Sequence, residues 1–190
     1  MGIFGTPRLT GSGDEPSGEH KTAEFEFGER KEQAGPLPIV DSLVDTVQWL
    51  ENAREKVAQG TANCCLVVCA PNPIDGAAME LTVEEIGNRF ANSLRSYDAI
   101  FRHGRDKFLI ALPHVKPADA TAVLDRLKGI IGNTPFHMPD NGLDIFVSVS
   151  LGGVMMDSNP VQELINRADR AMEAGRISRN YICMWSPELH

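Results

Sequence analysis

Hydrophobic residues first recur at helical spacing between Asp41 and Gly60. Apolar side chains that repeat every three or four residues line one face of a helix. Asp41 is a suitable N-cap and Gly60 a suitable stop, so the pattern predicts a helix with one buried face. The residues expected on that face are Leu43, Val47, Leu50 and Val57.

Three short apolar runs farther along the chain have the length of strands. Residues 64–70 are continuously apolar, which is typical of a strand buried on both faces, and Pro71 interrupts the run. Residues 99–103 and 108–112 are two such runs on either side of Gly104. Two apolar runs around a glycine-containing turn predict a β-hairpin.

Three more segments have the pattern of helices. Thr82 and Glu85 fit a capping box, in which each side chain bonds the other's backbone N–H at the start of a helix. Residues 118–131 show helical periodicity. Asn159 is a suitable cap for a further helix, with a proline in its first turn, and this helix is expected to end near Gly175.

Two strands complete the pattern. Apolar and polar residues alternate over 145–151, and residues 181–185 form a short last strand. The resulting order of helix, strand, helix, hairpin, helix, strand, helix, strand is typical of an α/β domain in which helices flank a mixed central sheet. Residues 1–36 lack apolar periodicity and are expected to be a disordered tail, which leaves residues 37–190 as the domain.

Composition and charge narrow the classes of function. The 190-residue chain is 42% hydrophobic, as a globular domain requires. No apolar run approaches the roughly 20 residues of a membrane helix, and the start does not resemble a signal peptide, so we expect a cytoplasmic protein without a membrane partner. A net charge of −8 argues against nucleic-acid binding but permits a small anion held by a local arginine cluster. The four cysteines lack zinc-ligand spacing.

The candidate chemistry lies around the predicted hairpin. The sequence Arg95-Ser-Tyr-Asp98 precedes it. The turn itself contains Gly104, Arg105, Asp106, Lys107 and Phe108. Two later segments are also distinctive: residues 147–153 read Val-Ser-Val-Ser-Leu-Gly-Gly, and residues 164–180 contain the sequence Ala-Asp-Arg-Ala and end in Arg-Asn. In this order and spacing, the motifs resemble those of the GGDEF family, the diguanylate cyclases.

The resemblance implies an active site that this chain has lost. Family members bind GTP with two divalent ions, which require converging oxygen ligands. Lys107 stands at the family's hairpin glutamate and Arg105 at its second glycine. Residues 66–71 offer no carboxylate, Gly175 takes the place of a phosphate-facing lysine, and the guanine-holding segment is missing. Asp106 alone is expected to be only a turn residue. We therefore expect no catalytic residues, no metal, no Mg²⁺ and no cyclase activity.

The resemblance also implies an inhibitory site, which this chain retains. In the family an Arg-x-x-Asp pair before the hairpin captures cyclic di-GMP, and Arg95 and Asp98 have that spacing. Arg126 stands where the family supplies another arginine, often from a second subunit, and Arg102 is expected beside the site. A guanidinium meets guanine O6 and N7 as a fork, and a carboxylate accepts from N1 and N2. The alternative is a solvated ion pair at a helix end.

Three hypotheses follow from these residues. The first is a catalytically inactive GGDEF protein that binds cyclic di-GMP, signals to an unidentified protein partner and forms a ligand-driven homodimer. The second is an interaction scaffold that binds no nucleotide. The third, which is remote, is a residually active cyclase. Survival of Arg95, Asp98 and Arg126 beside eroded catalytic positions favours the first hypothesis.

Overall fold

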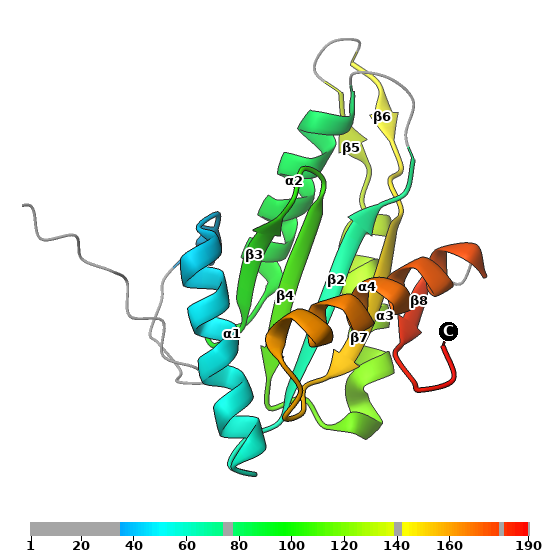
Figure 1. The fold of residues 1–190 in the computed structure, drawn as a ribbon. Helices are drawn as coiled ribbons and strands as arrows, with labels where there is room; N and C mark the ends of the chain where they lie inside the picture. Colours follow the sequence, from blue (N-terminus) through cyan, green and yellow to red (C-terminus); the bar gives the residue numbers. More distant parts are fainter. Residues whose placement is uncertain (1–34, 74–77, 139–141, 179–180, 190) are drawn as a thin grey trace, which may run out of the picture.

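A six-stranded sheet forms the centre of the protein, for which a computed structural model describes residues 35–73, 78–138, 142–178 and 181–189 (Figure 1). The strand order is β1-β3-β4-β2-β7-β8. These strands are β1 (Ile39–Val40), β2 (Cys64–Pro71), β3 (Ala99–His103), β4 (Lys107–Pro113), β7 (Val149–Met155) and β8 (Ile182–Met184). β2 is antiparallel to both of its neighbours, whereas β1 runs parallel to β3 and β8 runs parallel to β7. The predicted hairpin is confirmed as β3 and β4.

Four helices cover the two faces of this sheet. They are α1 (Leu43–Ala58), α2 (Ala78–Ser93), α3 (Ala120–Gly132) and α4 (Val161–Ile177), and a 3-10 turn at Pro117–Asp119 leads into α3. In Figure 1, α1 and α4 lie in front of the sheet, and α2 and α3 lie behind it. A separate two-stranded sheet pairs β5 (Phe136–His137) with β6 (Asp144–Ile145). The expected α/β architecture with a mixed central sheet is therefore observed.

The core has two halves, one on each face of the sheet. Along β2, alternate residues enter opposite halves: Cys65 and Val67 pack with α2 and α3, and Leu66 and Val68 pack with α1 and α4. Every residue of β2 is buried. Burial on both faces explains why this strand reads as a continuous apolar run rather than an alternating one.

The start and the buried face of α1 differ from those expected. Ser42 is the N-cap, and its hydroxyl accepts the Asp45 N–H at 3.3 Å, whereas Asp41 precedes the helix. Leu43 and Val47, both expected to be buried, are 75% and 41% exposed. The buried face carries Thr46, Trp49, Leu50 and Ala53. The Trp49 ring lies edge-on to Phe101 of β3 at 5.6 Å, so the large indole determines which face of α1 meets the sheet.

Two other predicted boundaries were wrong. The capping box at Thr82 does not exist, because α2 already begins at Ala78 and Thr82 lies buried inside it. Asn159 does not cap α4; its backbone and side-chain N–H groups donate to Asp157 Oδ1, and Pro160 occupies the cap position. The end of α4 at Ile177 agrees with the end expected near Gly175.

The predicted strand over 145–151 is divided between the two sheets. β6 ends at Ile145 and pairs with β5, whereas β7 begins at Val149 and pairs with β2. Between them, the Ser148 carbonyl accepts the Asn72 N–H at 2.9 Å. The alternating pattern indicates that one side of the chain is buried. It does not show whether the residues belong to one sheet or to two.

The predicted boundary between tail and domain, after residue 36, lies close to the first described residue, Gly35. Of the predicted tail, residues 1–34 lie outside the described residues, and Leu37 is buried, with its N–H donated to the Ala91 carbonyl at 2.8 Å. No helix in the described part of the chain has both the length and the apolar content needed to cross a membrane.

Candidate functional site

The hairpin between β3 and β4 carries an ion pair to α4. Gly104 at its turn has a φ of 69°, which glycine adopts without the steric penalty of a Cβ. Lys107 opens β4, and its Nζ donates to Asp169 Oδ1 at 2.6 Å. Burial, and then the Lys107 ammonium, lower the pKa of the nearby His103, so its imidazole stays neutral at physiological pH. The lysine and the α4 carboxylate thus neutralise each other.

The described residues around the end of β2 do not form a cluster of metal ligands. Mg²⁺ in proteins is bound by oxygen ligands in near-octahedral geometry. Within the described ranges, no group of three or more histidine, cysteine, aspartate or glutamate side chains is arranged to hold a metal ion. β2 ends in buried Cys69, Ala70 and Pro71, and burial raises the pKa of the Cys69 thiol, which therefore stays protonated.

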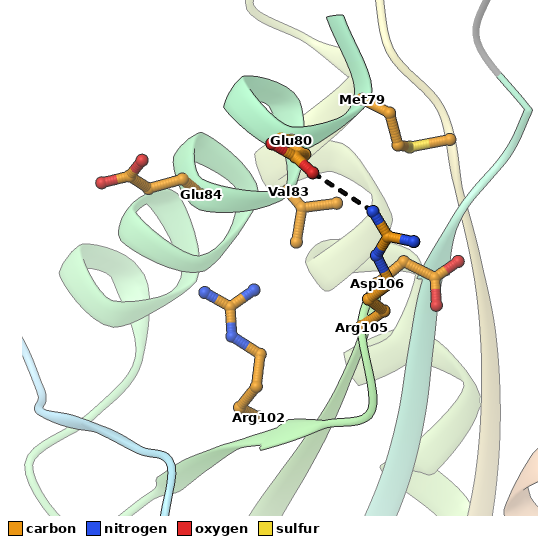
Figure 2. A pocket seen from close by; sticks show the side chains of 7 residues that line it. All are labelled: Met79, Glu80, Val83, Glu84, Arg102, Arg105 and Asp106. Atoms are coloured by element: carbon orange, nitrogen blue, oxygen red, sulfur yellow. Dashed lines mark hydrogen bonds and ion pairs between the residues drawn. The ribbon is translucent and has the colours of Figure 1, made fainter. Parts of the chain in front are cut away.

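A hollow of about 940 Å³ lies between the hairpin and α2 (Figure 2). Its lining comprises Arg102, Arg105 and Asp106 from the hairpin and Met79, Glu80, Val83 and Glu84 from α2. Arg105 Nη2 lies 3.2 Å from Glu80 Oε1, and Figure 2 shows this pair bridging the hairpin turn and α2. The lining thus carries both signs of charge, whereas a triphosphate is held best by a predominantly positive one.

Arg102 belongs to this hollow and not to the Arg95 turn, where it was expected. Its guanidinium carbon lies 4.9 Å from the centroid of the Phe108 ring, and its Nε lies 3.7 Å from Asp41 Oδ1. Arg102 points to the α2 side of β3 and enters the hollow beside Val83 (Figure 2). Its position on the strand, rather than its closeness in sequence to Asp98, decides where it points.

Arg95 and Asp98 close a tight turn between α2 and β3. The Arg95 N–H donates to Asp98 Oδ2 at 2.8 Å, and the Asp98 N–H donates to the Arg95 carbonyl at 2.9 Å. Asp98 is only 8% exposed, whereas the Arg95 side chain is exposed. Asp98 therefore has a structural role in this turn that does not depend on a ligand.

Arg126 approaches the same turn from α3. Burial raises the pKa of Asp98 to about 6, and the Arg95 N–H and then the charges of Arg95, Arg126 and His114 oppose that rise. Arg126 is exposed on α3, and its charge acts on the Asp98 carboxyl. The structure thus brings Arg95, Asp98 and Arg126 together within one chain.

Two aromatic residues of this site were not singled out from the sequence. Tyr97 lies inside the Arg-x-x-Asp motif, and Arg95 Nη1 donates to its hydroxyl at 2.8 Å. His114 follows β4, and the centroids of its ring and the Tyr97 ring are 5.5 Å apart. His114 also has a φ of 64°, which is uncommon outside glycine. No sequence periodicity connects these two positions; only the folded chain does.

The positive charge near the end of β2 comes from Arg176 and not from position 175, where a glycine stands. Gly175 packs against β8, where an added Cβ would lie 3.3 Å from the Ile182 backbone. Arg176 Nη2 donates to the Pro71 carbonyl at 3.4 Å, and its Nη1 lies 3.1 Å from Glu173 Oε1. A cation therefore remains at this end of α4, balanced by a neighbouring glutamate.

Comparison with known proteins decides the family. The family model described as diguanylate cyclase, GGDEF domain, matches residues 79–180, which is more than half of the chain. The chain belongs to the GGDEF family. Diguanylate cyclase DosC of Escherichia coli K12 is 31% identical to this GGDEF chain over 109 residues, covering 56% of the chain and 24% of DosC. The chain thus spans about a quarter of the length of that relative.

Solved GGDEF structures share the fold. The GGDEF domain of DgcB from Caulobacter crescentus, in complex with c-di-GMP, matches with a TM-score of 0.68 at 14% identity, covering 82% of this chain and 98% of that one. SiaD from Pseudomonas aeruginosa, in complex with its activator SiaC, matches with a TM-score of 0.66 at 20% identity, covering 75% of this chain and 57% of that one. At these identities the likeness establishes the architecture alone.

Proposed function

We propose that this chain is a GGDEF domain that binds cyclic di-GMP without making it and passes the signal to a protein partner. The observation that carries the proposal is the assembly of Arg95, Asp98 and Arg126 at one turn. The c-di-GMP complex of a GGDEF domain with the same fold supports the choice of ligand. A cytoplasmic location and the absence of nucleic-acid and membrane partners are part of the same proposal, and the net charge of −8 supports the absence of a nucleic-acid partner.

The chemistry of the turn suits a guanine nucleotide with a phosphodiester. Arg95 and Arg126 are exposed cations, and each guanidinium can meet guanine O6 and N7 or a phosphate with two parallel hydrogen bonds. Asp98 holds one carboxylate oxygen against the Arg95 N–H, which leaves the other as an acceptor for guanine N1 and N2. A ligand with two guanines and two phosphates offers both kinds of contact.

Loss of cyclase activity is proposed because the hairpin supplies positive charge where the reaction needs carboxylates. Lys107 is already paired with Asp169, and Arg105 reaches Glu80 across the hollow. Both ion pairs use carboxylates that could otherwise have served as ligands. We propose that the chain needs no metal and no other cofactor.

Titration calorimetry with cyclic di-GMP tests the proposal. We expect the wild type to bind and Arg126→Ala to bind about tenfold more weakly, since a guanidinium fork contributes about 1–3 kcal/mol. Arg170→Ala removes an exposed helical arginine from α4, on the opposite face of the sheet, and serves as the matched control. Absence of heat from the wild type at high micromolar ligand would refute the receptor function. Sedimentation velocity with and without ligand tests the ligand-driven homodimer.

A scaffold that binds no nucleotide is the second candidate, because α1 presents an apolar surface. Leu43 and Val44 are 75% and 73% exposed, next to Val47 on the same helix. SiaD, a GGDEF protein of the same fold, is known in complex with a protein activator. If the titration shows no binding, this surface becomes the leading site for a protein contact.

A further inference from the structure

We propose that Tyr97 and His114 form an aromatic wall of the Arg95 turn, on which a guanine base of the ligand stacks. This inference rests on the proposed cyclic di-GMP site and assigns it two further binding residues. It also assigns the Tyr97 hydroxyl a role in holding Arg95 in place before the ligand arrives.

The two rings meet from different segments of the chain. Tyr97 belongs to the turn between α2 and β3, and His114 follows the end of β4. Their ring centroids are 5.5 Å apart and their planes are inclined at 76°, an edge-to-face contact. Tyr97 is half-buried and His114 is exposed, so ring surface remains accessible beside Arg95. Every nucleobase has a π-face, and stacking on such a surface is a common way for proteins to hold one.

Arg95 is held against this wall in the described structure. Its Nη1 donates to the Tyr97 hydroxyl at 2.8 Å, and its Cζ lies 5.8 Å from the centroid of the Tyr97 ring. A long arginine side chain loses conformational freedom on binding, and prior restraint reduces that loss. A guanine that stacks on the wall would exchange the single bond to the hydroxyl for a forked contact to O6 and N7.

The backbone of His114 indicates that the imidazole has a role. Its φ of 64° lies in the left-handed region, which residues with a Cβ adopt at a free-energy cost. Its N–H donates to the Asn63 carbonyl at 2.8 Å, which fixes this conformation. Glycine would adopt the same backbone without the cost. A side chain at a strained position is a reason to look for function there, and here the side chain places a ring beside that of Tyr97.

Calorimetric titration of the full chain with cyclic di-GMP, using four variants, tests the wall. Tyr97→Phe keeps the ring but removes the hydroxyl that holds Arg95, so it should weaken binding about threefold, which is less than the effect of removing the ring. Tyr97→Leu removes the π-face and should weaken binding about tenfold or more. His114→Gly should weaken binding severalfold without lowering the melting temperature, because the backbone strain is relieved. Tyr181→Gly is the matched control, since Tyr181 is the other non-glycine residue at positive φ in the described part of the chain, at 61°.

The outcomes separate this inference from the function on which it rests. Weaker binding by Tyr97→Leu and His114→Gly, with Tyr181→Gly unchanged, supports the wall. If the wild type binds and Tyr97→Leu and His114→Gly bind equally well, the wall is refuted and the receptor function stands. If the wild type does not bind, both are refuted. Circular dichroism of each variant identifies any loss of affinity that results from unfolding.

Discussion

The Asp98 carboxyl titrates differently in the folded and unfolded chain. Only 8% of the residue is exposed, and its carboxylate accepts the Arg95 N–H. Burial raises the pKa of Asp98 from 3.8 to about 6, so the folded protein binds this proton more tightly than the unfolded chain does. The resulting stabilisation is complete below the unfolded pKa of 3.8 and is lost as the pH rises through about 6.

We therefore expect Asp98→Asn to be more stable than the wild type at about pH 8, by on the order of 2 kcal/mol, but not at about pH 4. The amide oxygen can still accept the Arg95 N–H, so the substitution mainly removes the titration. Urea denaturation across this pH range measures the free energy of unfolding of both proteins. Asp125→Asn, on the exposed side of α3, controls for loss of a surface charge. A difference that does not change with pH would contradict the raised pKa.

At the Arg95 turn, we expect Arg95→Ala to affect ligand binding alone and Asp98→Ala to affect both ligand binding and stability. Arg95→Ala should weaken cyclic di-GMP binding about tenfold to a hundredfold, because it removes a guanine fork but keeps the backbone N–H that Asp98 accepts. Asp98→Ala should weaken binding similarly and also lower the melting temperature, because the turn loses its acceptor. Lys107→Ala lies in the hairpin and should bind like the wild type. Calorimetry and thermal denaturation of the three variants check this, and unchanged binding by Arg95→Ala would mean that another pocket holds the ligand.

Motif spacing predicted some of the residues of this site and missed others. Arg95 and Asp98 lie within one short segment, so their proximity follows directly from the sequence, and the family spacing added Arg126. Arg102 was placed wrongly because it points to one side of a strand, towards α2, which no count of residues determines. Tyr97 and His114 meet only because β4 returns the chain to the turn before β3.

Some helices and strands could be predicted more accurately than others, because their sequence patterns are local. The continuous apolar run of β2 and the hairpin of β3 and β4 were predicted correctly, because burial on both faces and a turn glycine are local signals. The buried face of α1 was only partly predicted. Leu43 and Val47 lie on one face of α1 and Trp49 lies on another. The face with the larger Trp49 side chain packs on the sheet, and Leu43 and Val47 remain exposed.

We expect the protein to have no cyclase activity, even when Lys107 is replaced by the glutamate that the family has at this position. Wild type with GTP and Mg²⁺ or Mn²⁺ should yield no cyclic di-GMP. Lys107→Glu should yield none either, because β2 still lacks a carboxylate. In the wild type, Lys107 Nζ lies 2.6 Å from Asp169 Oδ1. The new glutamate would place a second negative charge beside Asp169, so the melting temperature should fall because the two carboxylates repel each other. Chromatography of nucleotide products and thermal denaturation measure the two effects.

A second substitution at Lys107, in the ion pair with Asp169, serves as the matched control. Lys107→Met removes the charge without adding a like one, so it should destabilise the hairpin less than Lys107→Glu does. Product that forms in proportion to the protein, and that persists in Lys107→Met, would overturn the assignment as an inactive domain.

Across the whole molecule, the order of the main elements was predictable, whereas the pairing of the shortest strands was not. Helices and strands alternate along the chain as expected, and the sheet is flanked on both faces. The strands that were not predicted are short ones: β1 joins the central sheet beside β3, and β5 pairs with the nearby β6 in a separate sheet. Two-residue strands have too short a pattern to be recognised without their partners.

The segment before the domain is expected to be dispensable for folding. Among the described residues, Leu37 is the first that packs in the core, and its N–H donates to the Ala91 carbonyl. A chain that starts at Gly35 keeps these contacts and β1, so its melting temperature should stay within a few degrees of that of the full chain. A chain that starts at Ile39 loses Leu37 and should melt lower, which makes it the informative control. Thermal denaturation by circular dichroism compares the three chains. A large drop already at Gly35 would show that residues 1–34, where Phe25 and Phe27 are the nearest aromatic residues, dock on the domain.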